Sequence, residues 1–348
     1  MVKKWMMPRA NSLAFRRKLQ VSIESNCGKM KRAGFFQIIS ESIRHHEKEI
    51  KNHNSFDLQN RVEIEMTIAE KLNKFRGCDY HIHPNYSIDA EGNIEQFVRI
   101  AIQKGLKKIC FTTHIDLDPA RFSVDRYIRN NGRLYVLNND IVRNYREQIE
   151  QMRKKYAHEI DIVYGFEFSY EKYYEDKISE FIQKFKPEFS IGSVHSVDSM
   201  EITSRKSILA AVRCFQPYSF MRKYYEVVTD LAQSELFSVI GHIDGYKKYL
   251  SKFWGLNEIE RMESEILPEF IPQIARTGVE FEINSSAYKK GLPSPYPAAN
   301  VIRCLVENGM QIGSIGSDAH SPDMVGYLID NAINYTQGAL IEITHLRK

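Results

Sequence analysis

The chain has 348 residues, of which 43% are hydrophobic and 26% charged, and its formal net charge is +4. These values are ordinary for a soluble globular protein with one large domain and an appendage, or with two smaller domains. No apolar run approaches the roughly 18 residues that a membrane-spanning helix needs, so we expect no integral membrane protein. The five cysteines lack paired spacing, which favours free thiols in a reducing compartment and predicts a cytoplasmic protein.

The basic residues are concentrated near the N-terminus. Residues 1–76 hold 16 Lys and Arg against 8 Asp and Glu, whereas residues 77–348 hold 32 against 36. Within the first segment, apolar residues recur at helical spacing on both sides of a break near residues 52–55. We predict a basic, mainly helical N-terminal extension over residues 1–76 and a catalytic barrel over residues 77–348. The extension is expected to pack on the barrel or to serve self-association.

Beyond residue 77, short apolar runs alternate with longer helical patterns. The predicted strands are Cys78–His83, Lys108–His114, Ile160–Phe168, Phe189–His195, Phe237–Ile243, Val279–Asn284 and Gln311–Ser317. The predicted helices between them include Asn93–Lys104, Leu134–Tyr156, Tyr173–Lys184, Glu258–Arg276 and Pro297–Asn308. Seven units of strand followed by helix predict an α/β fold whose parallel sheet is closed, or nearly closed, into a barrel.

Histidines and acids gather at the ends of these strands. His81 and His83 stand two positions apart, so both side chains leave the same face of one strand and can reach one ion. Six of the eight histidines beyond residue 76 lie at such strand ends, with three acids beside them. The candidate metal ligands are His81, His83, Asp89, His114, Glu167, His195, His242, Asp318 and His320. The strand ends of a β/α barrel converge on one face, and this ligand set is too large for one ion. We therefore predict two or three divalent ions, with Zn, Mn or Fe as candidates.

Six short motifs, in chain order, resemble those of the polymerase and histidinol phosphatase (PHP) superfamily. They are His81-Ile-His83, Thr112-Thr-His114, Gly165-Phe-Glu167, Ser193-Val-His195, Gly241-His242-Ile-Asp244 and Gly316-Ser-Asp318-Ala-His320. The resemblance covers about residues 78–330 and is strongest to histidinol-phosphatase-like members. It implies a distorted (β/α)7 barrel with a mainly helical N-terminal extension added to it. Ser286 and Ala287 depart from the family pattern, which more usually has a glycine there.

The resemblance also implies a role for each candidate residue. The first ion would be held by His81, His83, Glu167 and Asp318, the second by Glu167, His195 and His242, and the third by Asp89, His114 and His320. Lys248 is predicted to clamp the substrate phosphate, because the family carries a basic residue there. Lys247 and Asn284 are further candidates for substrate binding. For Asn284, an outer hydrogen bond to a metal-bound histidine and a structural role are equally open. The predicted catalytic residues are Glu167, Asp318 and Lys248.

These roles predict hydrolysis of a phosphate monoester. Three divalent cations with three carboxylates would leave a net charge of about +3, which attracts a phosphate dianion. A hydroxide that bridges two ions would attack phosphorus in line while the ions stabilise the leaving alkoxide. The resemblance makes L-histidinol phosphate, in histidine biosynthesis, the specific expectation for the small phosphorylated substrate.

Two other functions remain open. The same cluster could act on nucleotides, sugar phosphates or nucleic-acid ends, which the basic extension favours. The catalytic region is net acidic and has no basic stripe interleaved with aromatic residues, so nucleic acid is the weaker expectation. Alternatively, the chain could be a non-catalytic metal-binding interaction module, although all nine ligand positions are filled. The sequence leaves the oligomeric state undecided.

Overall fold

The computed structural model describes residues 66, 68–121, 126–130 and 132–346. Most of the predicted extension lies outside these residues, so its helices and the boundary after residue 76 stay predictions. None of the described helices combines the length and the apolar character needed to cross a lipid bilayer.

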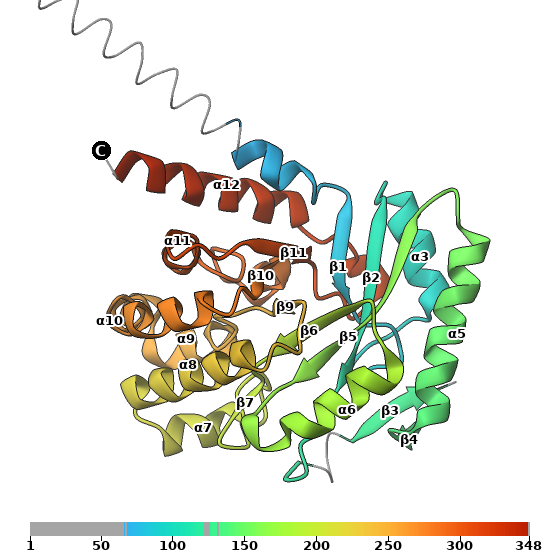
Figure 1. Ribbon diagram of the computed structural model, residues 1–348, viewed down its shortest axis with the longest axis horizontal. Helices are drawn as coiled ribbons and strands as arrows, with labels where there is room; N and C mark the ends of the chain where they lie inside the picture. Colours follow the sequence, from blue (N-terminus) through green and yellow to red (C-terminus); the bar gives the residue numbers. More distant parts are fainter. Residues whose placement is uncertain (1–65, 67, 122–125, 131, 347–348) are drawn as a thin grey trace, which may run out of the picture. The chain divides into compact units, whose positions relative to one another are not determined.

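One seven-stranded sheet organises the described part of the chain (Figure 1). Its strands are β1 (Cys78–Ile82), β2 (Lys108–Ile115), β5 (Asp161–Ser169), β6 (Phe189–Ser193), β9 (Val239–Ile240), β10 (Glu280–Asn284) and β11 (Ile312–Gly316). They lie side by side in that order, and each neighbouring pair is parallel. All seven carboxyl ends therefore lie at the same edge of the sheet.

The first and last strands also approach each other. Ile82 forms a parallel bridge with Ala319, and the His83 amide donates to the Ala319 carbonyl at 2.8 Å. The Ala319 amide in turn donates to the His81 carbonyl at 3.2 Å. The sheet is thus nearly closed into a barrel, which confirms the predicted (β/α)7 architecture.

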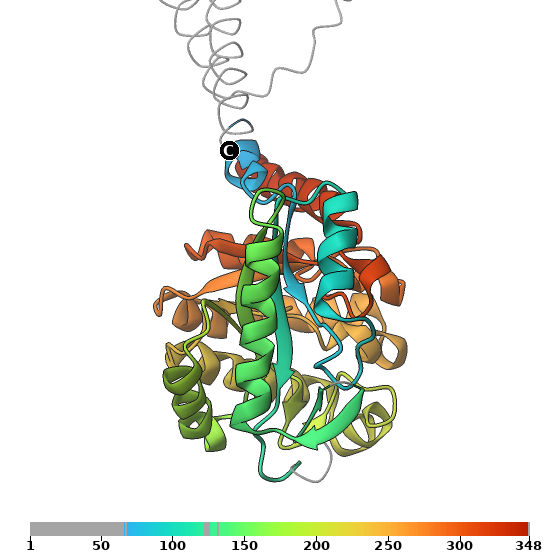
Figure 2. The same cartoon turned by 90° about the vertical axis from the view of Figure 1, so that its right-hand side faces the viewer.

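Helices surround the sheet (Figures 1 and 2). They are α3 (Ile94–Gln103), α5 (Asn139–Lys155), α6 (Glu175–Phe185), α7 (Ile208–Cys214), α8 (Pro217–Gln233), α9 (Lys247–Trp254), α10 (Leu256–Ala275), α11 (Ala299–Glu307) and α12 (Ile329–Leu346), with short 3-10 turns at η1 (Lys172–Tyr174), η2 (Ser285–Lys290) and η3 (Pro322–Met324). α3 illustrates how they attach. Asn93 caps its first turn by accepting the Gln96 amide, and Phe97 on its buried face meets Phe111 of β2 with ring centres 6.2 Å apart. Burying one such side chain contributes about 1.5–3 kcal/mol.

Two small hairpins interrupt the alternation of strand and helix. They are β3 (Tyr127–Asn130) with β4 (Arg133–Val136), and β7 (Ser196–Val197) with β8 (Met200–Glu201). The prediction of a helix from Leu134 is therefore wrong at its start. The helix begins at Asn139 because the Asn138 side chain accepts the amides of Asp140 and Ile141, each at 3.1 Å, and caps it there.

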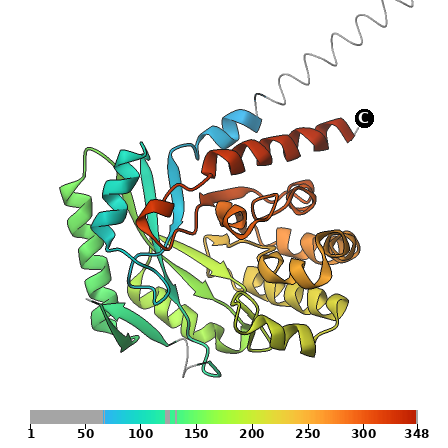
Figure 3. The ribbon, with the colours of Figure 1, turned by 180° about the vertical axis from the view of Figure 1, so that it is seen from behind.

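The described end of the predicted extension packs on the barrel. Residues 68–73 are helical and lie beside α12 (Figures 1 and 3). Leu72 is buried, and the Arg76 guanidinium donates to Asp330 at 2.8 Å and to Asn334 at 2.7 Å. These contacts join this segment to the last helix of the barrel.

Candidate metal centre

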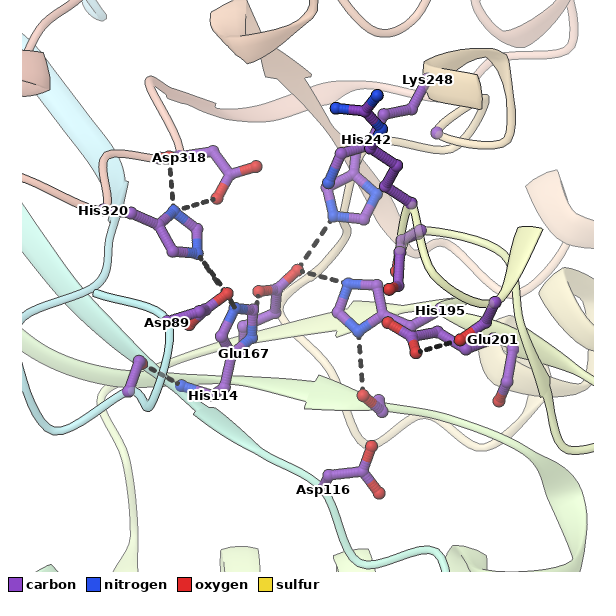
Figure 4. A pocket seen from close by; sticks show the side chains of 18 of the residues that line it. Asp89, His114, Asp116, Glu167, His195, Glu201, His242, Lys248, Asp318 and His320 are labelled. Atoms are coloured by element: carbon purple, nitrogen blue, oxygen red, sulfur yellow. Dashed lines mark hydrogen bonds and ion pairs between the residues drawn. The ribbon is translucent and has the colours of Figure 1, made fainter. Parts of the chain in front are cut away.

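The carboxyl ends of the strands surround one pocket of about 650 Å³. Seven of the nine predicted ligands line it, and they come from six different strands or the loops that follow them (Figure 4): Asp89, His114, Glu167, His195, His242, Asp318 and His320. His81 and His83, from the end of β1, are fully buried and contact this group. The structure therefore brings all nine predicted side chains together.

Glu167, at the centre of the cluster, is fully buried on β5. From Oε1 the distances are 3.0 Å to His242 Nε2 and 3.3 Å to His195 Nε2, and from Oε2 they are 3.2 Å to His81 Nε2, 3.4 Å to His83 Nε2 and 2.9 Å to His114 Nδ1. Burial by itself would raise the pKa of Glu167, but the charges of the surrounding imidazoles outweigh it and hold that pKa well below its usual value. The side chain is therefore a carboxylate with an imidazole group on each side.

Asp318 and Asp89 contact the histidines on either side of this centre. Asp318 Oδ1 lies 3.2 Å from His83 Nε2 and 3.7 Å from His81 Nε2, whereas Asp89 Oδ2 lies 3.1 Å from His320 Nε2 and 3.8 Å from His114 Nε2. These contacts do not separate the side chains into the three groups that the PHP resemblance implies, so that division stays a prediction. His114 adds a contact to Glu167, so adjacent groups share side chains.

Buried polar atoms without hydrogen-bond partners indicate what the cluster holds. His81 Nε2, His83 Nε2 and Glu167 Oε2 are buried, and their close contacts within the cluster give them no hydrogen bond among the described residues. Such atoms are rare because each costs free energy unless something binds it. The ligand atoms of these three residues lie within 4.8 Å of one another, close enough to share one ion. Imidazole and carboxylate ligands suit Zn, Mn or Fe, so the residues present fit divalent cations.

A family comparison agrees with this geometry. The sequence model of the PHP domain family matches residues 79–286. This match is more than half of the chain and runs from β1 past β10. The chain belongs to the PHP domain family.

Several relatives align with this PHP domain along most of their length. The probable histidinol-phosphatase of Deinococcus radiodurans is 24% identical over 265 residues, covering 74% of this chain and 91% of the relative. The histidinol-phosphatase of Bacillus subtilis is 26% identical and covers 72% of this chain and 95% of its own. The probable histidinol-phosphatase of Schizosaccharomyces pombe is 26% identical, and the match covers 71% of this chain and 81% of the relative.

Solved structures have a similar fold. The histidinol phosphate phosphatase of Lactococcus lactis, solved with Zn, L-histidinol and phosphate, matches with a TM-score of 0.57 at 22% identity, over 75% of this chain and 93% of that one. The putative histidinol phosphatase of Listeria monocytogenes matches with a TM-score of 0.63 at 18% identity. The match covers 73% of this chain and 99% of that one. At these identities the likeness establishes the barrel fold of the PHP domain.

Glu282 is a residue of the site that the sequence reasoning missed. It is fully buried on β10, where Oε1 lies 2.6 Å from His81 Nδ1 and Oε2 accepts the His242 amide at 3.0 Å. Hydrogen bonds of this kind orient metal-binding imidazoles and make them more basic. The available signal was its spacing, because Glu282 precedes Asn284 by two positions on one strand and therefore shares its face.

Two serines hold ligands in the same way. Ser169 Oγ lies 2.9 Å from His195 Nδ1, which leaves Nε2 of that ring directed at Glu167. The Ser193 hydroxyl donates to Glu167 Oε1 at 2.7 Å. Each serine is the last residue of its strand, β5 for Ser169 and β6 for Ser193, so the strands themselves place these contacts.

Replacing Glu282 with Gln should weaken metal binding about tenfold, because outer partners of ligating histidines contribute about 10- to 100-fold to metal affinity. The amide keeps the size of the side chain but loses the charge beside His81. Metal affinity would be measured by competition with a chelator. Glu280→Gln, at the exposed start of the same strand, is the matched control and should bind metal like the wild type. Equal affinities in both variants would contradict the role given to Glu282.

The two adjacent lysines of the PHP domain take different positions. Lys248 lines the pocket (Figure 4). Lys247 is only 3% exposed, and its Nζ lies 2.8 Å from Asp244 Oδ2 and 2.7 Å from Glu263 Oε1. Because two buried carboxylates hold its ammonium away from the pocket, the expectation that Lys247 binds substrate is corrected. Lys248 remains the candidate for the phosphate contact.

Asn284 is also absent from the pocket lining. It is fully buried, its Nδ2 donates to Glu282 Oε2 at 3.1 Å, and its Oδ1 accepts the Ser286 amide at 2.9 Å. Both ends of the amide are therefore engaged within the protein. This geometry corrects the expectation of a substrate contact and favours the outer hydrogen-bonding role for Asn284.

Proposed function

We propose that this protein is a metal-dependent phosphomonoesterase that acts on a small phosphorylated metabolite, with L-histidinol phosphate as its substrate. The proposal depends above all on one observation: nine histidine and carboxylate side chains converge on one pocket that Lys248 also lines. Membership of the PHP family supports phosphate chemistry. The relatives named histidinol-phosphatase, and the Lactococcus lactis structure with Zn, L-histidinol and phosphate, support the choice of substrate.

We divide the nine candidate ligands into three groups, two of which share Glu167. We assign one ion to His81, His83, Glu167 and Asp318, a second to Glu167, His195 and His242, and a third to Asp89, His114 and His320. Divalent cations bound there would supply Lewis acidity toward phosphoryl oxygens and would lower the pKa of a water molecule toward neutrality. If the site holds two ions and not three, we assign them to the two groups that contain Glu167.

The remaining pocket residues of this chain bind and orient the substrate. We assign the phosphate to the side of Lys248, whose ammonium is a point charge for a phosphate oxygen. Asp116 and Glu201 also line the pocket. A carboxylate and an ammonium in one cavity suit a substrate that carries a phosphate at one end and an amine at the other, as L-histidinol phosphate does.

The test of this proposal is a substrate panel on the metal-loaded protein. L-histidinol phosphate, nucleoside monophosphates, sugar phosphates and short 5′-phosphorylated oligonucleotides would be compared by phosphate release. We expect kcat/KM for L-histidinol phosphate to exceed that for every other compound by about 100-fold, since a site built for polar groups discriminates strongly. A higher kcat/KM for another class of compound would show that the substrate is not L-histidinol phosphate. Full metal loading without any turnover would favour the metal-binding interaction module.

One observation favours the second candidate, a more anionic substrate such as a nucleotide or a sugar bisphosphate. Arg205 and Lys206 line the same pocket, next to the hydroxyls of Ser204 and Ser207. In the described part of the chain, neither cation forms an ion pair. These charges could accept a second anionic group, and the panel above separates the two candidates.

A further inference from the structure

Residues 242–248 form a tight turn with a predicted ligand at one end and the predicted phosphate contact at the other. The Gly245 amide donates to the His242 carbonyl at 2.6 Å, and the Lys248 amide donates to the Gly245 carbonyl at 3.0 Å. α9 then starts at Lys247 without any side-chain cap on its first turn. Something other than a cap must therefore hold the start of this helix.

The side chain of Lys247 supplies that anchor. Asp244 Oδ2, which lies 2.8 Å from Lys247 Nζ, also accepts the Ala298 amide at 2.9 Å. Glu263 of α10, which lies 2.7 Å from the same Nζ, accepts the Asn300 amide group at 2.7 Å. One ammonium thus ties the turn to α10 and to the segment that enters α11.

A buried group of charges such as Asp244, Lys247 and Glu263 is weak evidence for a stabilising role. Burial alone would lower the pKa of Lys247, but Asp244 and Glu263 outweigh it and raise that pKa, so the side chain is an ammonium. Apolar residues of similar volume commonly stabilise a core as well as a buried ion pair does. The contact between Lys247 Nζ and Glu263 Oε1, at 2.7 Å, joins the turn to α10 at one point.

The two ends of the turn depend on this anchor to different degrees. His242 is held independently, because its amide donates to Glu282 at 3.0 Å and its Nε2 lies 3.0 Å from Glu167. The Lys248 ammonium lies 5.5 Å from the centre of the Tyr249 ring and forms no hydrogen bond or ion pair within the described residues. Its position therefore follows the backbone at the start of α9.

We propose that Lys247 is a positioning residue, whose ion pairs with Asp244 and Glu263 fix the start of α9 and thereby direct Lys248 at the phosphate. This inference rests on the proposed function, in which Lys248 binds the phosphate. It predicts that the ion-pair group, which consists of Asp244, Lys247 and Glu263, raises phosphate affinity through Lys248. The positions of the metal ligands should not depend on this group.

The test removes the three charges together, so that no buried charge is left unpaired. The variant carries Asp244→Asn, Lys247→Met and Glu263→Gln, and it would be examined in the wild-type and in the Lys248→Met background. Calorimetry with inorganic phosphate on the Zn-loaded proteins should show about tenfold weaker binding in the wild-type background. In the Lys248→Met background the same substitutions should change the affinity less than about twofold, since coupled residues are non-additive. Zn content per chain should equal that of the wild type.

Three results would overturn the inference. They are an equal loss of phosphate affinity in both backgrounds, no loss in either, or loss of fold or of Zn in the triple variant, which would give the ion-pair group a purely structural role. The proposed function has a separate readout. If the wild type binds phosphate but hydrolyses no phosphomonoester, the proposed function fails, while the four phosphate affinities still decide the role of Lys247. Absence of phosphate binding by the wild type would overturn both.

Discussion

Replacing Glu167 with Gln is expected to lower kcat by about 10³-fold or more and to reduce the metal content at two positions. Glu167 lies within 3.4 Å of five imidazoles, and the neutral amide removes the one negative charge that they share. Loss of ions removes the charge stabilisation on which metal-assisted hydrolysis depends. Metal per chain would be measured by mass spectrometry of the purified protein, and kcat by phosphate release.

Glu171→Gln is the matched control for this prediction. Glu171 follows the same strand but does not line the pocket, and its Oε1 accepts the Ser196 hydroxyl at 2.7 Å and the Ser199 amide at 2.9 Å. Burial raises the pKa of Glu171, so a neutral amide of equal size should be tolerated. We expect the metal content and kcat of this variant to stay close to the wild type. A Glu167→Gln protein that keeps its ions and its turnover would rule out the bridging role.

Replacing Lys248 with Met should lower kcat/KM by about 10- to 100-fold with little change in metal content. A charge-assisted hydrogen bond to a charged group is worth about 1.5–3 kcal/mol, and each 1.4 kcal/mol corresponds to about tenfold. Lys248 lines the pocket but lies in none of the predicted ligand groups. Steady-state kinetics on L-histidinol phosphate, with phosphate affinity measured alongside, would check the loss.

Lys252→Met provides the comparison one turn further along α9. Lys252 is exposed, does not line the pocket, and lies 6.0 Å from the centre of the same Tyr249 ring. The Lys252→Met substitution removes the same charge from the same helix as Lys248→Met does. A general electrostatic effect on phosphate binding would therefore appear in both variants. Losses of equal size would show that net charge, and not a contact from Lys248, governs phosphate binding.

The amino-acid sequence by itself determined the barrel and the gathering of nine histidine and carboxylate side chains at one edge of its sheet. Alternating apolar runs and helical patterns are local signals, and parallel strands place their carboxyl ends at one edge. Polar residues at the carboxyl ends of several such strands, such as His83, His114 and His195, must therefore meet. The prediction needed no knowledge of distances, because topology alone brings distant strand ends together.

Only the tertiary structure decided which neighbours of the cluster do what. Lys247 and Lys248 are adjacent and chemically identical, yet successive residues of a helix point about 100° apart, so one is buried against Glu263 and the other faces the pocket. Likewise Glu282 becomes a partner of His81 across 201 positions of sequence. Such assignments depend on how α10 and β10 pack against the turn and the first strand, and side-chain packing between distant elements leaves no periodic pattern in the sequence.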